Sequence, residues 1–216
     1  MNATELTKAT RFRILSCMSS SPPTESTSTV RETLLEKALD VFVRYGYRKT
    51  SMEDVATAAG ISRQTIYLHF RSKEALFLAG TEHLFDGALQ AVGRRLANDT
   101  PIEDALVGAF DEWHGRFVET FLNSPHIGEI MEASNSLAAD AVCAKEDKFV
   151  ALLAAAIEKA GLAPASVGLS PTDAASLLNA TSRGYKHTVS SRDEYQQKMR
   201  SAVRVLCAAS GVLNSS

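Results

Sequence analysis

The chain has 216 residues, of which 45% are hydrophobic and 22% are charged, and its formal net charge is -2. This length allows one domain or two small ones with a substantial core. Cys17, Cys143 and Cys207 lie far apart without a CxxC pair, which argues against a disulfide framework or a zinc site. The chain also lacks the roughly 18 uninterrupted apolar residues of a membrane span and the apolar core of a secretion signal. We therefore expect a soluble cytoplasmic protein with no membrane contact.

Charge is distributed unevenly along the chain. Residues 30–80 carry eight basic and six acidic side chains, whereas residues 81–216 carry twelve basic and seventeen acidic ones. A mildly cationic N-terminal part and an anionic C-terminal part suit a protein that contacts a polyanion with one end only. Differences of this size also arise by chance, so the charge alone does not identify a partner.

The first segment is predicted to be a flexible arm over residues 1–27. Residues 16–29, SCMSSSPPTESTST, are rich in Ser, Thr and Pro and cannot bury enough apolar surface to offset the entropy of ordering. Arg11 and Arg13 could let this arm reach a minor groove, but a solvated tail is the simpler interpretation, and we assign the arm no role.

Three short helices are predicted between residues 30 and 70. Thr50 or Ser51 supplies the N-cap of the second helix. Gly60 ends that helix, and Ser62 caps the third. Two short helices joined by a turn of about three residues that contains glycine form a helix-turn-helix. In the first helix, apolar side chains recur every three or four residues, at Leu35, Ala38, Leu39, Phe42 and Val43.

The third of these helices has an outer face suited to reading DNA. Ile66 and Phe70 can face the other two helices, so the side chains left outside are those of Arg63, Gln64, Thr65, Tyr67 and His69. Arginine can bind guanine O6 and N7 together, glutamine can pair with adenine N6 and N7, and a threonine methyl can meet a thymine methyl. A merely solvated helix face is the alternative interpretation.

Other residues of this region are suited to phosphates, which fix register without carrying sequence information. Tyr67, His69 and Lys73 have side chains of this kind. Thr50 and Ser51, at a helix N-terminus, can add hydroxyl and backbone N–H donors.

The rest of the chain is expected to form about six further helices, because no strand alternation is found after Ser72. Proline and glycine mark their ends: Pro101 opens one toward Leu122, Pro125 opens a short one, and Pro171 opens another. The fold class is therefore predicted to be all-α with about nine helices, three in an N-terminal helix-turn-helix head and about six in a C-terminal body.

An aromatic stripe lies on one side of the Pro101 helix, at Leu106, Phe110, Trp113, Phe117 and Phe121. Such a stripe usually means core, but a ligand cavity also needs apolar walls with a few polar groups. Candidate ligand contacts are Trp113, His114, Phe117, Met131 and Tyr185, with His126 and His187 as further possibilities. For each of them, core or interface packing is the alternative.

The last two helices are predicted over residues 171–190 and 192–212. Small and larger apolar residues alternate at helical spacing in the second, at Met199, Ala202, Val203, Leu206, Ala209 and Ser210. Such a pair can pack against its copy in a second chain as a four-helix bundle. Burial of this stripe within one subunit is the alternative.

Three glycines interrupt the helix that follows the head, at positions 80, 87 and 93. Each costs about 1 kcal/mol relative to alanine in a helix interior, so we expect a reason for their presence. Either they permit close packing, or they also allow the helix to bend as it links body and head.

Residues 34–77, LLEKALDVFVRYGYRKTSMEDVATAAGISRQTIYLHFRSKEALF, closely resemble the DNA-binding head of the TetR family, whose name comes from the tetracycline repressor. The match is ungapped and is carried by Ala38, Phe42, Gly46, Tyr47, Thr50, Ser51, Val55, Ala56, Ala59, Gly60, Ser62, Tyr67, Phe70, Lys73, Leu76 and Phe77. The resemblance fades after about Gly80.

The resemblance implies a DNA-binding domain over residues 28–88, with its helix-turn-helix motif at about 51–70, and an effector-binding and dimerisation domain over residues 89–216. It implies a homodimer, joined through the last two helices, that binds a palindromic double-stranded operator and is released by a small-molecule effector, most commonly as a repressor in the bacterial cytoplasm. It implies DNA contacts by Arg63, Gln64, Thr65, Tyr67, Leu68, His69 and Lys73. No cofactor is implied.

Two other functions remain open at this point. A helix-turn-helix regulator could be controlled by a protein partner or act constitutively. An enzyme is the alternative from another class, but the sequence shows no HExxH, GxSxG or GxGxxG motif and no nucleophile with an evident base partner. We therefore expect no catalytic residue and no metal site.

Overall fold

The computed structural model describes residues 30–162 and 168–210, so the predicted arm over residues 1–27 lies outside the described part. This part contains no strand, and its helical elements are α2 (Val30–Tyr45), α3 (Met52–Ala58), α4 (Arg63–His69), α5 (Lys73–Ala97), α6 (Ile102–Trp113), the 3-10 turn η2 (Gly115–Phe117), α7 (Val118–Asn123), α8 (Ile127–Leu137), α9 (Ala139–Lys159), α10 (Pro171–Tyr185) and α11 (Arg192–Ala209). The all-α prediction is confirmed. No helix in these ranges is both long enough and apolar enough to cross a bilayer.

Residues 30–162 and 168–210 form ten α-helices, one more than the nine expected, because the predicted helix from Pro101 to Leu122 is divided. It ends at Trp113, and η2 separates α6 from α7. Gly115 lies in this break, where an added Cβ would meet Oδ1 of Asp111 and would also come within 2.9 Å of the Tyr195 ring. These two close approaches therefore explain why a residue without a side chain stands at the break.

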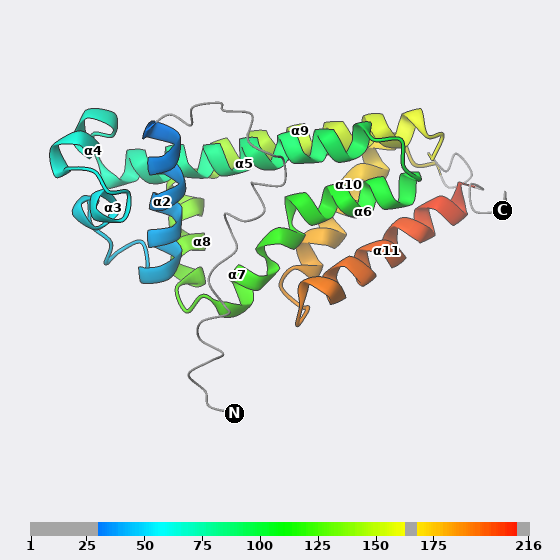
Figure 1. Cartoon of the computed structure of the whole chain (residues 1–216). Coiled ribbons are helices and arrows are strands. Elements are labelled where there is room, and N and C mark those ends of the chain that lie inside the picture. Colours follow the sequence, from blue (N-terminus) through cyan, green and yellow to red (C-terminus); the bar gives the residue numbers. More distant parts are fainter. Residues whose placement is uncertain (1–29, 163–167, 211–216) are drawn as a thin grey trace.

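The helices form a head and a body that share the long helix α5. Figure 1 shows α3 and α4 at one end of the molecule and α11 at the other, with α5 extending from the first group into the second. Helix α8 packs against α2 as well as α5, so the body also contacts the head away from α5. Since α5 continues through residue 88, no break in the helix marks the expected domain boundary, and the division remains a prediction.

The head has its own hydrophobic core. Phe42 and Phe77 pack edge to face with their ring centres 5.5 Å apart, and Tyr47 packs against both rings. Ile66 joins them from α4 and is fully buried. This core fixes the orientation of α4, because the side that holds Ile66 cannot turn outward without exposing it.

The helix starts follow the capping residues expected from the sequence. Ser51 caps α3 in a capping box with Asp54, so of the two candidates Ser51 is the N-cap. Ser62 caps α4 and Ser72 caps α5, each by accepting a hydrogen bond from a backbone N–H three residues on.

The glycines of α5 have different surroundings. An added Cβ at Gly80 would lie 3.2 Å from Cγ of Leu39, so α2 packs closely against α5 at this point. At Gly93 an added Cβ would meet no atom within 4 Å. Close packing therefore accounts for Gly80 but does not account for Gly93.

Candidate nucleic-acid interface and ligand cavity

Helix α4 presents a row of exposed side chains to solvent. Arg63, Gln64, Tyr67 and His69 are exposed, and Leu68 retains 80% of its accessible surface. Thr65 is half-buried and its hydroxyl lies 2.8 Å from the hydroxyl of Ser62. The structure thus brings the expected recognition residues together on one short helix.

Arg63 is held by two neighbours on the surface. Its Nε lies 2.7 Å from a carboxylate oxygen of Glu53, and its guanidinium lies 5.7 Å from the centre of the Tyr67 ring. Both partners are exposed or half-exposed, so water and salt screen this ion pair and a stronger acceptor can replace it. Sequence reasoning did not include Glu53 in the site.

Lys73 and Thr50 lie behind this surface. The Thr50 side chain is buried, and its hydroxyl donates to the Gly46 carbonyl at 2.7 Å. The Lys73 ammonium donates to the carbonyls of Tyr47, Arg48 and Thr50 at 2.9, 3.2 and 3.1 Å. These polar groups are therefore already engaged in holding the loop between α2 and α3, whereas Ser51 remains half-exposed at the start of α3.

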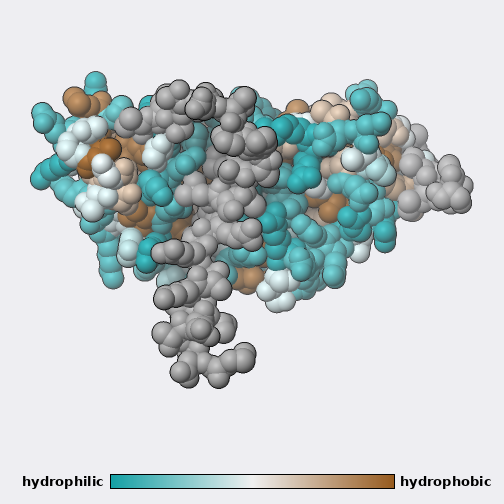
Figure 2. Space-filling model, in the orientation of Figure 1, coloured by the Kyte–Doolittle hydropathy of each residue, from teal (hydrophilic) through white to brown (hydrophobic). Residues whose placement is uncertain are grey.

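One face of the molecule is mainly polar. On the face drawn in Figure 2, hydrophilic residues predominate over head and body, and hydrophobic ones form small separate spots. Among the described residues, no group of His, Cys, Asp or Glu side chains is placed to hold a metal ion.

A cavity of about 680 Å³ lies between the head and the body. It is lined by residues of α2, α5, α6, η2 and α7 to α10, including Leu39 and Val43 from the head. A volume of this size suits a drug-sized organic molecule. Aromatic rings make up much of its wall, those of Phe77, Phe85, Trp113, Phe117 and Phe121.

Four of the five candidate ligand residues line this cavity, namely Trp113, His114, Phe117 and Met131. Tyr185 is not among the described lining residues. It packs against the body core, and the Lys198 ammonium lies 5.6 Å from the centre of its ring.

His114 belongs to a buried polar chain. Its Nδ1 lies 2.7 Å from Oγ of Ser182, which lies 2.5 Å from the Tyr195 hydroxyl, and that hydroxyl donates to the Phe110 carbonyl at 3.2 Å. For all three contacts to be hydrogen bonds, Tyr195 donates to the carbonyl, Ser182 donates to Tyr195, and Nδ1 of His114 donates to Ser182. This assignment leaves Nε2 as the acceptor atom of the ring.

Burial also keeps this imidazole neutral. It holds the pKa of His114 well below 6.5, and the positive charges of Lys186 and Arg183 and the ring of His187 act in the same direction. A neutral histidine at the cavity wall can accept a hydrogen bond through Nε2 or pack as a flat ring.

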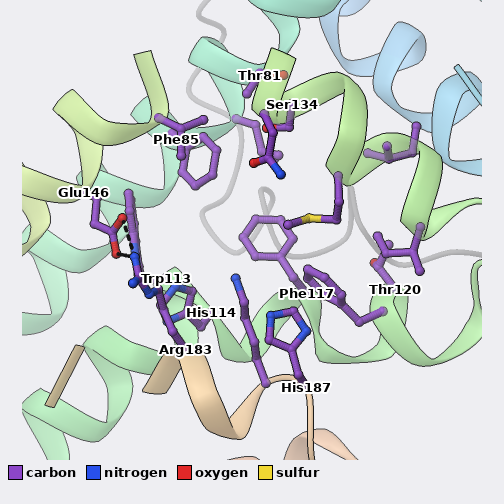
Figure 3. A pocket seen from close by; sticks show the side chains of 18 of the residues that line it. Thr81, Phe85, Trp113, His114, Phe117, Thr120, Ser134, Glu146, Arg183 and His187 are labelled. Atoms are coloured by element: carbon purple, nitrogen blue, oxygen red, sulfur yellow. Dashed lines mark hydrogen bonds and ion pairs between the residues drawn. The ribbon is translucent and has the colours of Figure 1, made fainter. Parts of the chain in front are cut away.

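Charged side chains gather on one side of the cavity. The guanidinium of Arg183 pairs with the carboxylate of Glu146 at 3.0 Å, and Asn179 donates to the same carboxylate at 2.8 Å. Figure 3 shows Arg183 and His187 on the side opposite Thr81 and Ser134. Sequence reasoning did not select Glu146, Arg183 or Lys186, because no motif relates positions on α9 to the end of α10.

Helix α8 contacts both the cavity and the head. Ile130 and Met131 line the cavity, whereas Ala133 is buried in the head core. Glu129 and Glu132 of the same helix bind the backbone N–H and the guanidinium of Arg48, respectively.

A second contact lies just before α8. The Ser124 hydroxyl donates to the Val43 carbonyl at the end of α2, at 2.9 Å. A change in the position of α8 or of the turn before it would therefore act on the head directly.

The fold and the site define an all-α helix-turn-helix protein with a cavity between its head and its body. Residues 34–79 match the family described as bacterial regulatory proteins, tetR family. The expected resemblance of this segment to the DNA-binding head of the TetR family is confirmed.

Curated relatives match part of the chain. YezE of Bacillus subtilis, an uncharacterized HTH-type transcriptional regulator, is 34% identical over 79 residues, which cover 37% of this chain and 41% of YezE. TcmR of Streptomyces glaucescens, an HTH-type transcriptional regulator, is 34% identical over 86 residues, 40% of this chain and 38% of TcmR. The matched segment thus spans less than half the length of these two relatives.

Solved structures are similar over most of the chain. The TetR family transcriptional regulator PfmR from Thermus thermophilus is superimposed with a TM-score of 0.56 at 20% identity, over 80% of this chain and 96% of PfmR. At this identity the likeness shows a shared fold, which includes the body as well as the head.

Proposed function

We propose that this protein is a sequence-specific DNA-binding transcriptional regulator, a repressor that a small-molecule effector releases from its operator. The observation that carries the proposal is the exposed face of α4, held outward by the buried Ile66 within a segment that matches the TetR family. A rigid short helix with polar side chains on its outer side fits the major groove of B-DNA.

Each side chain on the outer side of α4 has a role in this proposal. The guanidinium of Arg63 leaves the Glu53 carboxylate and donates to O6 and N7 of guanine, and Gln64 pairs with adenine. Thr65 and Leu68 offer methyl groups to thymine, while Tyr67 and His69 contact phosphates.

Three further residues support that contact. Ser51 offers its backbone N–H and hydroxyl to a phosphate at the start of α3. Thr50 and Lys73 act mainly by holding the loop in place, because their donors are bound to backbone carbonyls, and the charge of Lys73 adds to the attraction for phosphates.

Effector binding is assigned to the cavity between head and body. A ligand there contacts Met131 on α8 and Leu39 on α2. The opposite side of α8 packs into the head core. Binding that favours one position of α8 would shift the heads of a dimer relative to each other and change its fit to an operator.

The proposed homodimer uses the outer faces of α10 and α11. Met199, Val203 and Leu206 from the predicted stripe are buried in the subunit's own core, so they are not free for a second copy. The neighbouring residues Leu177 and Val205 are 58% and 70% exposed, which is unusual for large apolar side chains. An isologous four-helix bundle would cover both.

The proposal contains no catalytic step and needs no cofactor, and it places the protein in the bacterial cytoplasm. Selection of bound duplexes from a random pool tests its core. We expect a two-fold symmetric sequence to be enriched, with altered base preference for Arg63→Ala. If no sequence is enriched and no duplex is retained at low salt, the proposal is wrong.

A further inference from the structure

The lining of the cavity carries one more positive side chain than negative ones. The acidic and basic residues of this lining, apart from its histidines, are Glu146, Arg183 and Lys186. Arg183 and Asn179 already engage the Glu146 carboxylate. No ion pair to Lys186 occurs within residues 30–162 and 168–210, and its ammonium lies 5.2 Å from the centre of the Phe121 ring.

We propose that the effector is an organic anion with an aromatic or aliphatic body, and that its anionic group binds Lys186. This inference rests on the proposed ligand-responsive function and specifies the chemistry of its ligand. A half-buried ammonium such as that of Lys186 has lost part of its hydration. Without an ion-pair partner among the described residues, it is stabilised strongly by an anion that a ligand delivers.

The pKa values of Lys186 and of its neighbour His187 are consistent with an excess of positive charge on this side of the cavity. Burial lowers the pKa of Lys186, and Arg183 lowers it further, while Glu146 opposes the shift. The pKa of His187 is lowered by burial and by Lys186. An anion at this place would relieve the repulsion among these groups, whereas a cation would increase it.

The remaining wall fits an apolar body. Trp113, Phe117 and Phe85 offer ring surfaces, and Phe85 packs against both of the other rings. Thr81 and Ser134 supply hydroxyl groups on the side opposite Arg183 and His187 (Figure 3). The ligand would thus extend from the charged side across the rings toward these hydroxyls.

A cationic ligand is the main rival, because aromatic walls and one carboxylate could also bind an amine. The contacts of Glu146 argue against it. Its carboxylate accepts two hydrogen bonds from Arg183 and one from Asn179, and it is the one acidic side chain among the described lining residues. A ligand cation would have to displace Arg183 and leave two positive side chains in the cavity.

Two fluorescent probes that differ by a single anionic group test the inference on the full chain. These are 1-anilinonaphthalene-8-sulfonate and its neutral parent N-phenyl-1-naphthylamine. Trp113 is the only tryptophan of the chain and lines the cavity, so energy transfer from it reports a bound probe, and its efficiency should be highest for a probe inside the cavity. We expect the sulfonate to bind about tenfold more tightly than the neutral probe, as a charge-assisted contact would give.

Variants of Lys186 assign that preference to its charge. Lys186→Met should remove it while leaving affinity for the neutral probe within about twofold, and Lys186→Arg should retain it. Lys148→Met, which removes an exposed lysine of α9, is the matched control and should bind both probes as the original chain does.

The inference is wrong if the two probes bind the original chain equally, if decylammonium displaces them better than decanoate does, or if Lys186→Met keeps the preference. If Lys186→Met does not fold, the comparison of the two probes and that of decylammonium with decanoate, both made on the original chain, still test the inference. The measurement contains no DNA, so its failure leaves the DNA-binding proposal standing, and a failure to select an operator leaves the probe preference standing.

Discussion

The ammonium group of Lys73 donates to the Tyr47 carbonyl at 2.9 Å and lies 4.6 Å from the centre of the Tyr47 ring. Lys73 is the first residue of α5, and Tyr47 lies in the turn that follows α2. Since the same ammonium also binds the carbonyls of Arg48 and Thr50, one side chain holds the loop that leads into the helix-turn-helix.

Lys73→Met should therefore destabilise the protein and not simply weaken phosphate contacts. Three carbonyls would lose a charged donor, and we expect the free energy of unfolding to fall by about 1–3 kcal/mol. Urea unfolding followed by circular dichroism measures this, with Lys49→Met as the control because Lys49 is exposed. Equal stability of the two variants would show that the Lys73 contacts contribute nothing.

Glu53 restrains Arg63 in the free protein, so Glu53→Gln should increase affinity for the selected operator severalfold. The substitution removes a carboxylate that repels phosphates and that competes for the guanidinium of Arg63. Fluorescence anisotropy with a labelled duplex measures the change. Asp193→Asn on α11 serves as the control for lost negative charge, and weaker binding by Glu53→Gln than by this control would refute the prediction.

Two of the three glycines of α5, Gly80 and Gly93, should respond to alanine in opposite directions. Gly80→Ala would press against Leu39 and should cost about 1–3 kcal/mol of stability. The methyl group that Gly93→Ala adds would lie in open space. The free energy of unfolding should therefore rise by up to about 1 kcal/mol, because alanine has the better helix propensity. Thermal unfolding of both variants tests this pair, and a shift of the same sign for both would contradict it.

Stability should fall as the pH drops below about 6.5, because the pKa of His114 is lowered in the folded protein. The unfolded chain takes up the proton first, so the loss begins near the unfolded pKa and continues down to the folded one, with a slope of up to about 1.4 kcal/mol per pH unit. His187, whose pKa is also lowered, adds to the same trend. Urea midpoints at about pH 7.5 and 5.5 should differ less in His114→Gln, and an unchanged difference would exclude His114 as the cause.

The proposed dimer depends on Val205, so Val205→Glu should produce a monomer with weakened operator binding. Burying a carboxylate in an apolar interface without a partner is strongly unfavourable. Sedimentation equilibrium measures the mass, and Leu122→Glu, at an exposed leucine of α7, is the control. A dimeric Val205→Glu protein would place the interface elsewhere.

Local signals were sufficient to predict the head. Ser51, Ser62 and Ser72 act as caps where the sequence indicated, and Gly46 and Gly60 have positive φ values at the ends of their helices. These features depend on a few neighbouring residues and so can be recognised from the chain alone.

Features that depend on distant residues were not predicted. The need for glycine at position 115 depends on Tyr195 of α11 as well as on Asp111, because an added Cβ would meet both side chains. The charged side of the cavity needs Glu146 of α9 beside Arg183 of α10, and the role of Lys73 appears only when the loop after α2 folds back on α5. Periodicity within one helix carries no information about these contacts.

The most direct test of the central claim is the affinity for the selected operator after chemical changes in one groove at a time. Replacing guanine by 7-deazaguanine removes N7 from the major groove, and replacing it by inosine removes the amino group from the minor groove. We expect 7-deazaguanine at one position of each half-site to cost about tenfold in affinity for the original chain and little for Arg63→Ala. Equal losses in both proteins, or sensitivity to inosine alone, would contradict insertion of α4 into the major groove.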